Sequence, residues 1–309
     1  MHLMIPYAAP MSEAGRQASA SLKLPRLQAL LGRWTEVDRD SADEWSLSPP
    51  HERARARALG LRGGSGQLPW AALQARADGL AVGDRAWGLV TPAHWHLGTD
   101  QVSLLDPQTL MLDEAGSKAC FDAVQDLFTS AGYAVHRAAP LRWYIAHESL
   151  ARLATASLDR VIGRNVDAWL GSDPAMQPLR RLQSEVQMLL YTHPLNEQRE
   201  AQGLLPVNSF WLSGCGVAQA VTGIEPTTDA RLRGSALADD WAAWVKAWDT
   251  LDEGPLADLL QRADRGEAVR LTLCGERAAA TFEPAPRSLL QRARGLFAAS
   301  AMLPLLESL

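Results

Sequence analysis

The 309-residue sequence predicts an α/β protein, with a mixed or largely parallel sheet flanked by helices. Two observations support this class. Short apolar runs that suit buried strands are separated by longer segments with helical periodicity. In addition, 47% of the residues are hydrophobic and only 21% are charged, which allows a substantial core. We expect a single α/β body over residues 1–309, with a possible subdivision near residues 80–170.

In the first half of the chain, helix signals are apolar residues at i, i+3 and i+4 spacing. Pro25 and Pro69 stand at positions that the first turn of a helix tolerates, and Gly132 is typical of the residue after a helix end. The expected elements are a strand at Leu3–Ile5, a helix within 19–34, a helix from Pro69, two strands within 84–107 and a helix over 113–133.

The second half continues the alternation. The expected elements are a strand within 141–150, short helical or loop structure over 150–163, a helix from Pro178, a short helix over 194–203, a strand at Val207–Ser213, a helix over 236–252, a strand pair over 268–282 and a helix over 286–309. Trp241, Trp244 and Trp248 share one helical face, so we interpret them as core residues rather than a ligand cage. The strands Leu3–Ile5 and Val207–Ser213 are expected inside the sheet.

The stretch "THPLNEQREAQGLLPVNSFWLSGCG" concentrates polar residues and glycines at one helix–strand junction. Asn196 and Arg199 share a helical face, Asn208 begins the strand, and Gly214 and Gly216 allow a sharp turn at its end. Ligands of open α/β sheets usually bind at that end of a strand. We expect these five residues to bind a small anionic ligand, because arginine and glycine N–H groups suit carboxylates and phosphates. The alternative is that they only join helix to strand.

Composition excludes several partners. The formal net charge of −5 favours neither nucleic acid nor an anionic membrane, and no apolar run is long enough for a membrane span. Three widely spaced cysteines indicate neither a disulfide framework nor a structural zinc, so a cytoplasmic location is expected. The arginine-rich stretch His51–Arg62 is interpreted as a solvated helix, with a phosphate-binding patch as the alternative.

His94 and His96 are the candidate metal ligands. On a strand both rings project from one face about 7 Å apart, and Asp100 is a candidate third ligand, with Asp84 and Asp106 as alternatives. A half-buried strand with hydrogen-bonded histidines accounts for the same pattern. We therefore expect no cofactor, and a divalent metal only if this group assembles.

The order "DP…PL…HPLN..R...G..PVN..WL.G.G", from Asp173 to Gly216, resembles the archaeal-type cofactor-independent phosphoglycerate mutases. Its stricter form resembles the bacterial group called RpfE-type regulatory proteins. This resemblance implies an alkaline-phosphatase-like core in reduced form. The sequence lacks catalytic residues that the mutases have. The segment "LMIPYAAP" offers no carboxylate for the first metal ligand, and only Val90 or Thr99 falls at the position of the nucleophilic serine. No histidine follows His193.

The resemblance and these departures together imply a catalytically degenerate, phosphoglycerate mutase-like protein that acts as a regulatory or small-anion-sensing module. Two alternatives stay open. One is an active metal-dependent phosphomutase or phosphatase on a small phosphorylated metabolite, using His94, His96 and Asp100. The other is a protein-interaction scaffold, which the eleven tryptophans would suit if several were exposed.

Overall fold

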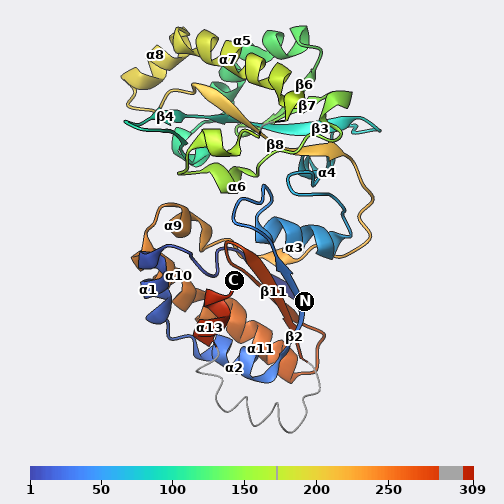
Figure 1. Ribbon diagram of the computed structural model, residues 1–309, viewed down its shortest axis with the longest axis vertical. Coiled ribbons are helices and arrows are strands. Elements are labelled where there is room, and N and C mark those ends of the chain that lie inside the picture. The colour runs from blue at the N-terminus through green and yellow to red at the C-terminus, as the bar shows by residue number, and fades with distance from the viewer. Residues whose placement is uncertain (172, 285–301) are drawn as a thin grey trace. The chain divides into compact units, whose positions relative to one another are not determined.

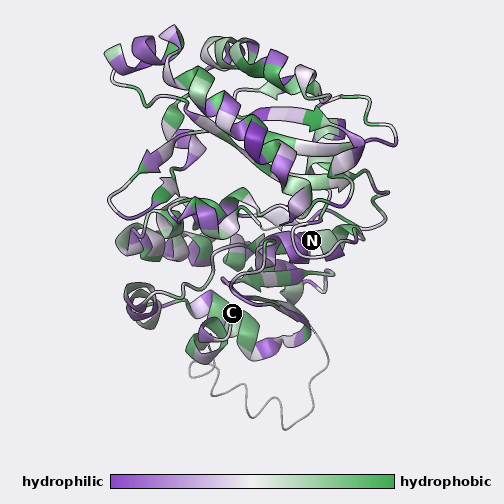
Figure 2. Ribbon diagram, turned by 45° about the horizontal axis from the view of Figure 1, so that its top comes forward, coloured by the Kyte–Doolittle hydropathy of each residue, from purple (hydrophilic) through white to green (hydrophobic). Residues whose placement is uncertain are grey.

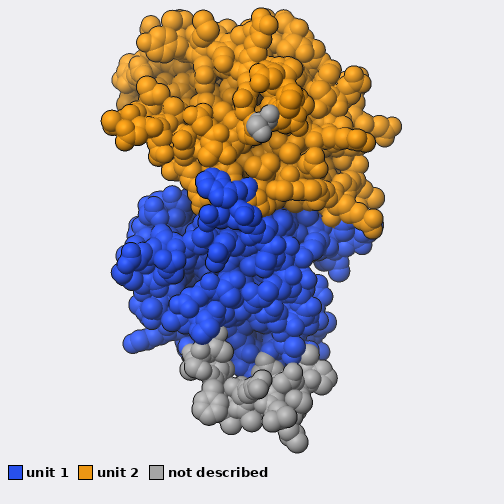
Figure 3. Space-filling view, in the orientation of Figure 1, with its two compact units in different colours: residues 1–45, 49–60, 222–309 blue, residues 46–48, 61–221 orange. Residues whose placement is uncertain are grey.

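The computed structural model describes residues 1–171, 173–284 and 302–309 (Figure 1). The chain divides into two compact units, coloured separately in Figure 3. Unit 1 contains Met1–Trp45, Pro49–Gly60 and Thr222–Leu309, and unit 2 contains Ser46–Ser48 and Leu61–Val221. Each unit combines a sheet with helices, which confirms the predicted α/β class. The segment 80–170, where a subdivision was expected, lies inside unit 2.

Unit 1 is built on a five-stranded mixed sheet in the order β2-β11-β10-β1-β9. Its strands are β1 (His2–Ile5), β2 (Thr35–Ser41), β9 (Thr227–Thr228), β10 (Arg270–Cys274) and β11 (Ala278–Glu283). Strands β9, β1 and β10 run parallel, whereas β11 is antiparallel to both β10 and β2. The strand predicted at Leu3–Ile5 therefore lies inside the sheet between two parallel neighbours, as its wholly apolar sequence indicates.

Helices cover the sheet of unit 1 and complete its core. They are α1 (Glu13–Ala20), α2 (Pro25–Arg33), α3 (Pro50–Leu59), α9 (Arg233–Leu237), α10 (Trp241–Leu251), the π-helical segment η5 (Asp252–Leu256), α11 (Ala257–Asp264) and α13 (Met302–Glu307). Leu3 and Ile5 of β1 pack in one cluster with Trp244 and Trp248 of α10, and all four residues are almost wholly buried. The interpretation of these two tryptophans as core residues is confirmed.

The C-terminal residues 302–309 also belong to the core of unit 1. Met302, Leu306 and Leu309 are buried in the same cluster as the tryptophans. The main-chain oxygen of Leu309 accepts hydrogen bonds from the N–H groups that begin β11 and precede it. Of the helix predicted over 286–309, residues 286–301 lie outside the described part of the chain, and α13 forms its described end.

Unit 2 contains a four-stranded antiparallel sheet in the order β6-β7-β3-β8 and a separate hairpin, β4-β5. The strands are β3 (Ala86–Ala93), β4 (Trp95–Leu97), β5 (Val102–Leu104), β6 (Ala134–Ala139), β7 (Arg142–Ala146) and β8 (Ser209–Val217). The expected inner position of Val207–Ser213 is wrong, because β8 is an edge strand. Its apolar sequence reflects helices on both faces rather than strands on both sides.

Helices and turns surround this sheet. They are α4 (Trp70–Ala77), η1 (Pro107–Leu110), α5 (Glu114–Ser130), η2 (Glu148–Leu150), α6 (Leu158–Val161), η3 (Val166–Trp169), η4 (Pro174–Met176), α7 (Gln177–Tyr191) and α8 (Pro194–Ala201). On β7, Trp143 and Ile145 pack with α5 and α7, whereas Tyr144 and Ala146 pack with α4. The two faces of the sheet are therefore covered by different helices, which Figure 1 shows as separate layers.

The helices carry hydrophobic and hydrophilic residues interleaved along their length, as Figure 2 shows. The helical spacing of Leu179, Leu182, Val186, Leu189 and Leu190 predicts one apolar stripe on α7; Leu189 is partly buried and the other four residues are buried. Within the described residues, no helix combines the length and apolarity needed to cross a membrane.

Candidate functional site

The predicted helix–strand junction is held together by side chains that bind main-chain groups. From α8, Asn196 donates to the main-chain oxygens of Leu190 and Val207, both at 2.8 Å, and accepts from the Val207 N–H at 2.9 Å. Asn196 is 6% exposed and Val207 is 1% exposed. The carboxamide therefore takes the place that a neighbouring strand would take for Val207.

Arg199, the predicted anion ligand, is also directed at main-chain oxygens. Its Nε donates to the carbonyl of Leu205 at 2.9 Å, and its Nη2 donates to the carbonyl of Leu110. The residue is only 7% exposed. Glu185 of α7 pairs with Arg181 at 3.1 Å. Arg199 thus joins α8, the segment after it and the end of η1.

Asn208 fixes the start of β8 from the opposite side. Its Oδ1 accepts from the Trp95 N–H at 2.7 Å, and its Nδ2 donates to the Trp95 oxygen at 2.9 Å. Its own N–H donates to Ala93 at 3.2 Å, so the side chain extends the β3–β8 ladder by one position. Asn196, Arg199 and Asn208 therefore all secure residues 205–208.

Gly214 and Gly216 lie further along β8 and serve a close approach. Gly214 has φ +63°, and a Cβ there would lie 3.0 Å from both the main-chain nitrogen of Ala71 and the Cβ of Trp70. A Cβ on Gly216 would lie 3.0 Å from Pro69. Both glycines thus let the start of α4 pack on β8. The five predicted residues do not converge on one point, and ligand binding by them stays a prediction.

The predicted histidine pair lies beside the same junction. The ring centroids of His94 and His96 are 6.4 Å apart, close to the expected spacing. The Nδ1 of His94 is 2.8 Å from the carbonyl oxygen of Pro206, and His96 and Asp100 are exposed. Within the described ranges, no group of three or more His, Cys, Asp or Glu side chains is placed to hold a metal ion. His94, His96 and Asp100 are thus not assembled as a ligand set.

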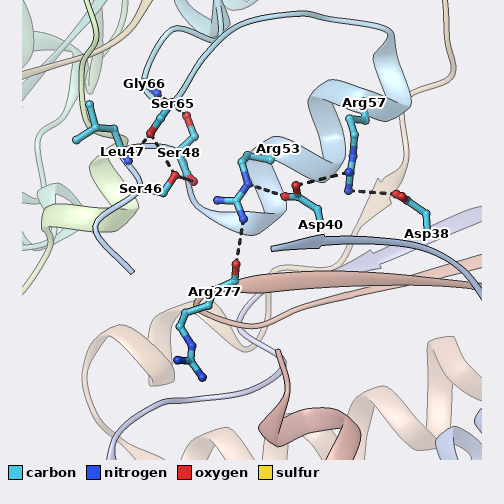
Figure 4. Close-up of polar contacts among 10 residues, drawn as sticks. All are labelled: Asp38, Asp40, Ser46, Leu47, Ser48, Arg53, Arg57, Ser65, Gly66 and Arg277. Carbon is cyan, nitrogen blue, oxygen red and sulfur yellow. Dashed lines mark hydrogen bonds and ion pairs between the residues drawn. The ribbon is translucent and has the colours of Figure 1, made fainter. Parts of the chain in front are cut away.

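The arginine-rich helix α3 is neutralised by carboxylates of unit 1, as Figure 4 shows for one part of it. Asp40 lies between Arg53, at 2.5 Å, and Arg57, at 3.5 Å, and Arg57 also reaches Asp38 at 3.1 Å. Arg55 pairs with Glu225 at 2.7 Å. These ion pairs favour the interpretation of a solvated, paired helix over a phosphate patch.

A pocket in unit 2, which the sequence did not predict, lies between β8 and α7. It is partly open, and its cavity volume is only about 20 Å³. Its walls are largely apolar and aromatic; they include Trp169, Met176, Leu179, Phe210, Trp211 and Leu212. The composition of these walls is that of small-molecule sites, but the space is far smaller than the roughly 300–1,000 Å³ of such sites.

Arg180 and Gln183 contribute polar groups to the pocket lining from α7. The Nη2 of Arg180 donates to the carbonyl oxygens of Leu170, at 2.9 Å, and Gly171. Its Nε is buried and has no hydrogen-bond partner among the described residues. Gln183 donates to the carbonyl of Phe210 at 2.7 Å. One weak signal in the sequence could have identified Arg180 as a pocket residue, namely its position. Arg180 flanks the apolar stripe of α7, whereas Arg181 points away from that stripe and is exposed.

A second hollow in unit 2 is much larger, with a cavity volume of about 540 Å³, and is more open, with a lining that is more apolar than polar. It is lined by Asp84, Arg85, His147 and Glu148, together with small residues. The two acids and the arginine give it mixed charge. The β8 pocket is the more enclosed of the two and, unlike the larger hollow, has no acidic residue in its lining.

No protein-family model matches the chain, and no curated protein matches its sequence. Two solved structures are similar to it at low identity. The cofactor-independent phosphoglycerate mutase from Thermoplasma acidophilum DSM 1728 is 12% identical, with a TM-score of 0.38, over 95% of this chain and 94% of that one. The PH0037 protein from Pyrococcus horikoshii is 12% identical, with a TM-score of 0.40, over 99% and 97% of the two chains. The similarity is distant and assigns no residue a role.

Proposed function

We propose that unit 2 binds a small anionic molecule in the β8 pocket and that the protein acts as a ligand-sensing regulatory module. The observation that carries this proposal is the position of Arg180. Arg180 is part of the lining of a largely apolar pocket, and its buried Nε has no acceptor among the described residues. A buried donor without a partner costs about 1–3 kcal/mol, so an anion that reached this nitrogen after a shift of the pocket wall would recover free energy.

The walls of the pocket strengthen such an interaction. Trp169, Phe210 and Trp211 limit the access of water, and a charged hydrogen bond gains strength where the local dielectric constant is low. Arginine is also better suited than lysine to a partly buried anion, because its guanidinium is planar and more weakly hydrated.

The predicted junction residues contribute indirectly in this proposal. Asn196, Arg199 and Asn208 secure residues 205–208, which lead directly into the pocket wall formed by Phe210 and Trp211. They are positioning residues for β8, and Arg180 takes the ligand-binding role first expected of Arg199. The reason is that both observed Arg199 donors already have main-chain acceptors.

A regulatory role is favoured over phosphoryl transfer by the residues at the end of β1. This strand continues into Pro6 and Tyr7, where the mutases that the sequence resembles carry an acidic metal ligand. Two-metal phosphoryl transfer depends on clustered carboxylates and histidines that stabilise the attacking and leaving oxygens. The sequence of this segment provides no carboxylate for that task.

Binding can be tested by thermal shift and calorimetry with inorganic phosphate, glycerol phosphate, acetate and hexanoate. We expect at least one of these anions to raise the melting temperature of the wild type and of Arg181→Gln, but not of Arg180→Gln. Arg181 is the matched control, because it has the same charge on the same helix and is exposed. An equal shift in all three proteins would place the anion elsewhere and contradict the proposed site.

Turnover is tested separately on any anion that binds. The wild type is incubated with a bound phosphate ester, with and without added Mn²⁺ or Zn²⁺, and released phosphate is measured. We expect no release above the buffer control. Metal-dependent release that is lost in His94→Ala or His96→Ala would replace the regulatory proposal with the phosphatase alternative.

A further inference from the structure

We infer that the larger hollow of unit 2 binds a zwitterion of the size of an α-amino acid, with an ammonium group, a carboxylate group and an apolar side chain. The cavity volume of about 540 Å³ lies within the range of roughly 300–1,000 Å³ that is usual for small-molecule sites. This site is separate from the anion site proposed at Arg180, because the two hollows share no lining residue.

The apolar part of the lining lies at one end of the four-stranded sheet. It includes Ala86, the first residue of β3, and the last residues of β7 and β8, Ala146 and Val217. Ala86 pairs with Val217, and its carbonyl accepts from the His147 N–H at 3.0 Å. Hydrogen bonds between strands therefore fix a surface of small apolar residues, which suits the apolar side chain of a ligand.

Charged side chains complete the lining, and they are not paired with one another. Asp84 and Arg85 are adjacent in the chain, yet neither they nor Glu148 has an ion-pair partner among the described residues. Elsewhere in unit 2, Arg142 and Asp78 pair at 3.0 Å. Opposite charges that line one hollow without pairing are available to a ligand that carries both signs of charge.

The acidic part of the lining favours an ammonium group. Asp84 and Glu148 carry two negative charges against the one positive charge of Arg85. Gly132 also lines the hollow, and it follows the C-terminal end of α5, which has no basic residue in its last turn. The C-terminal end of a helix carries a partial negative charge, so it attracts a cation as well.

Arg85 and His147 supply donors for a carboxylate. The guanidinium of Arg85 offers paired N–H groups that match the two oxygens of a carboxylate. The Nδ1 of His147 accepts from the Ser149 N–H at 3.2 Å, so the proton of the neutral ring is on Nε2, which is then a donor. An amine without a carboxylate would be repelled by Arg85, and a carboxylate without an ammonium would be repelled by the two acids.

The test is calorimetry on the full chain with three molecules of matched shape. They are leucine, 3-methylbutylamine, which lacks the carboxylate, and 4-methylpentanoate, which lacks the ammonium. We expect leucine to bind at least about tenfold more tightly than either, because each head group contributes a charged hydrogen bond. Glycine should bind about five- to tenfold more weakly than leucine, because it leaves the apolar part of the lining uncovered.

Variants at exposed positions identify the groups that bind, because they do not disturb the core. Arg85→Gln should lower the affinity for leucine about tenfold and should not weaken the binding of 3-methylbutylamine. The double variant Asp84→Asn with Glu148→Gln should weaken the binding of both molecules. Arg76→Gln and Asp126→Asn are the controls; these residues of unit 2 are exposed and lie outside the lining, so the affinity of the wild type should be kept.

Three results would contradict a zwitterion site. The first is that 3-methylbutylamine or 4-methylpentanoate binds as tightly as leucine. The second is that Arg85→Gln binds leucine as tightly as the wild type does, and the third is that leucine does not bind at millimolar concentrations. None of these results bears on the anion site, which is tested through Arg180, so the two proposals fail independently.

Discussion

The side chain of Asn196 and the main chain of Val207 exchange two hydrogen bonds: Nδ2 donates to the carbonyl at 2.8 Å, and Oδ1 accepts from the N–H at 2.9 Å. This is the pattern by which two residues pair in an antiparallel sheet. Because both residues are buried, water cannot replace either bond. A single side chain therefore fixes the segment that precedes β8 and the pocket wall.

Replacement of Asn196 by alanine is expected to lower the free energy of unfolding by about 2–4 kcal/mol, because it leaves the buried N–H and carbonyl groups of Val207 without their partner. Asn196→Asp should be at least as harmful, since a carboxylate cannot donate to the two carbonyl oxygens. Urea denaturation measures both changes. Gln198→Ala, an exposed position on the same helix, is the control and should change stability by less than about 0.5 kcal/mol. A similar small change for Asn196→Ala would show that these bonds contribute little.

Arg199→Ala is expected to lower stability by about 2–3 kcal/mol without changing the affinity for any anion that binds at Arg180. The buried guanidinium donates to Leu205 and Leu110, so its removal leaves two carbonyl oxygens unpaired. Denaturation and calorimetry on the same variant separate the two effects. The opposite result, lost binding with unchanged stability, would restore the sequence-based assignment of Arg199 as a ligand-binding residue.

Elements whose signals are local could be predicted from the sequence. The stripe Leu179, Leu182, Val186 and Leu190 gave the buried face of α7, because residues at i, i+3 and i+4 share one side of any helix. The Trp244 and Trp248 core positions followed in the same way. Asp113 begins α5 with its carboxylate on the Gly116 N–H, and Gly132 follows the end of that helix.

Features that depend on distant segments could not be predicted. The buried carboxylate of Asp252 accepts from the Leu27 N–H at 2.8 Å and so caps α2 across 225 sequence positions. No local pattern marks such a partner. The edge position of β8 was missed for a related reason, since a strand covered by helices on both faces is as apolar as a central one.

In the candidate site, too, local features could be predicted and those that depend on distant segments could not. The sequence located the junction residues Asn196, Arg199 and Asn208, but it did not reveal that their partners are main-chain groups. Arg180 and Arg181 are adjacent and chemically identical in the sequence. Their positions relative to the apolar stripe of α7 distinguish them only weakly, and the partners of Arg180 depend on the tertiary structure, which brings the turn at Leu170 and the strand β8 to one side of α7.

All three cysteines are expected to react slowly with thiol reagents in the folded protein. Burial raises the pKa of Cys120 to about 12 and that of Cys215 to about 12, and it raises the pKa of Cys274 well above its usual range. At pH 8 the thiolate fraction of a group with such a pKa is on the order of 10⁻⁴, and the thiolate is the reactive form. Labelling with a chromogenic disulfide should therefore require denaturant. One rapidly labelled thiol in the native protein, identified by mass spectrometry, would contradict this expectation for that cysteine.

Stability is expected to fall as the pH falls from 6.5 towards 4, in part because of His2. Burial, followed by the nearby Arg270, lowers the pKa of His2 from 6.5 to about 4, although Glu283 acts in the opposite direction. Over this range the unfolded chain binds a proton that the folded chain does not, so the contribution of His2 is complete above pH 6.5 and is lost as the pH approaches 4. The ring is partly exposed, so we expect a loss of about 1–2 kcal/mol rather than the full value of the pKa shift.

His2→Asn isolates this contribution from that of the carboxylates, which also titrate at the lower end of the range. The His2 Nε2 lies 2.7 Å from the Thr272 hydroxyl, which in turn lies 2.8 Å from the Thr281 hydroxyl. An asparagine side chain can keep a hydrogen bond to Thr272, but it does not titrate. Urea midpoints measured from pH 4 to pH 7.5 should decline less steeply for the variant, with the difference concentrated between pH 4.5 and 6.5. If the urea midpoint falls equally with pH in His2→Asn and in the wild type, another group causes the loss of stability in acid. The reason is that the variant cannot take up the proton that His2 binds on unfolding.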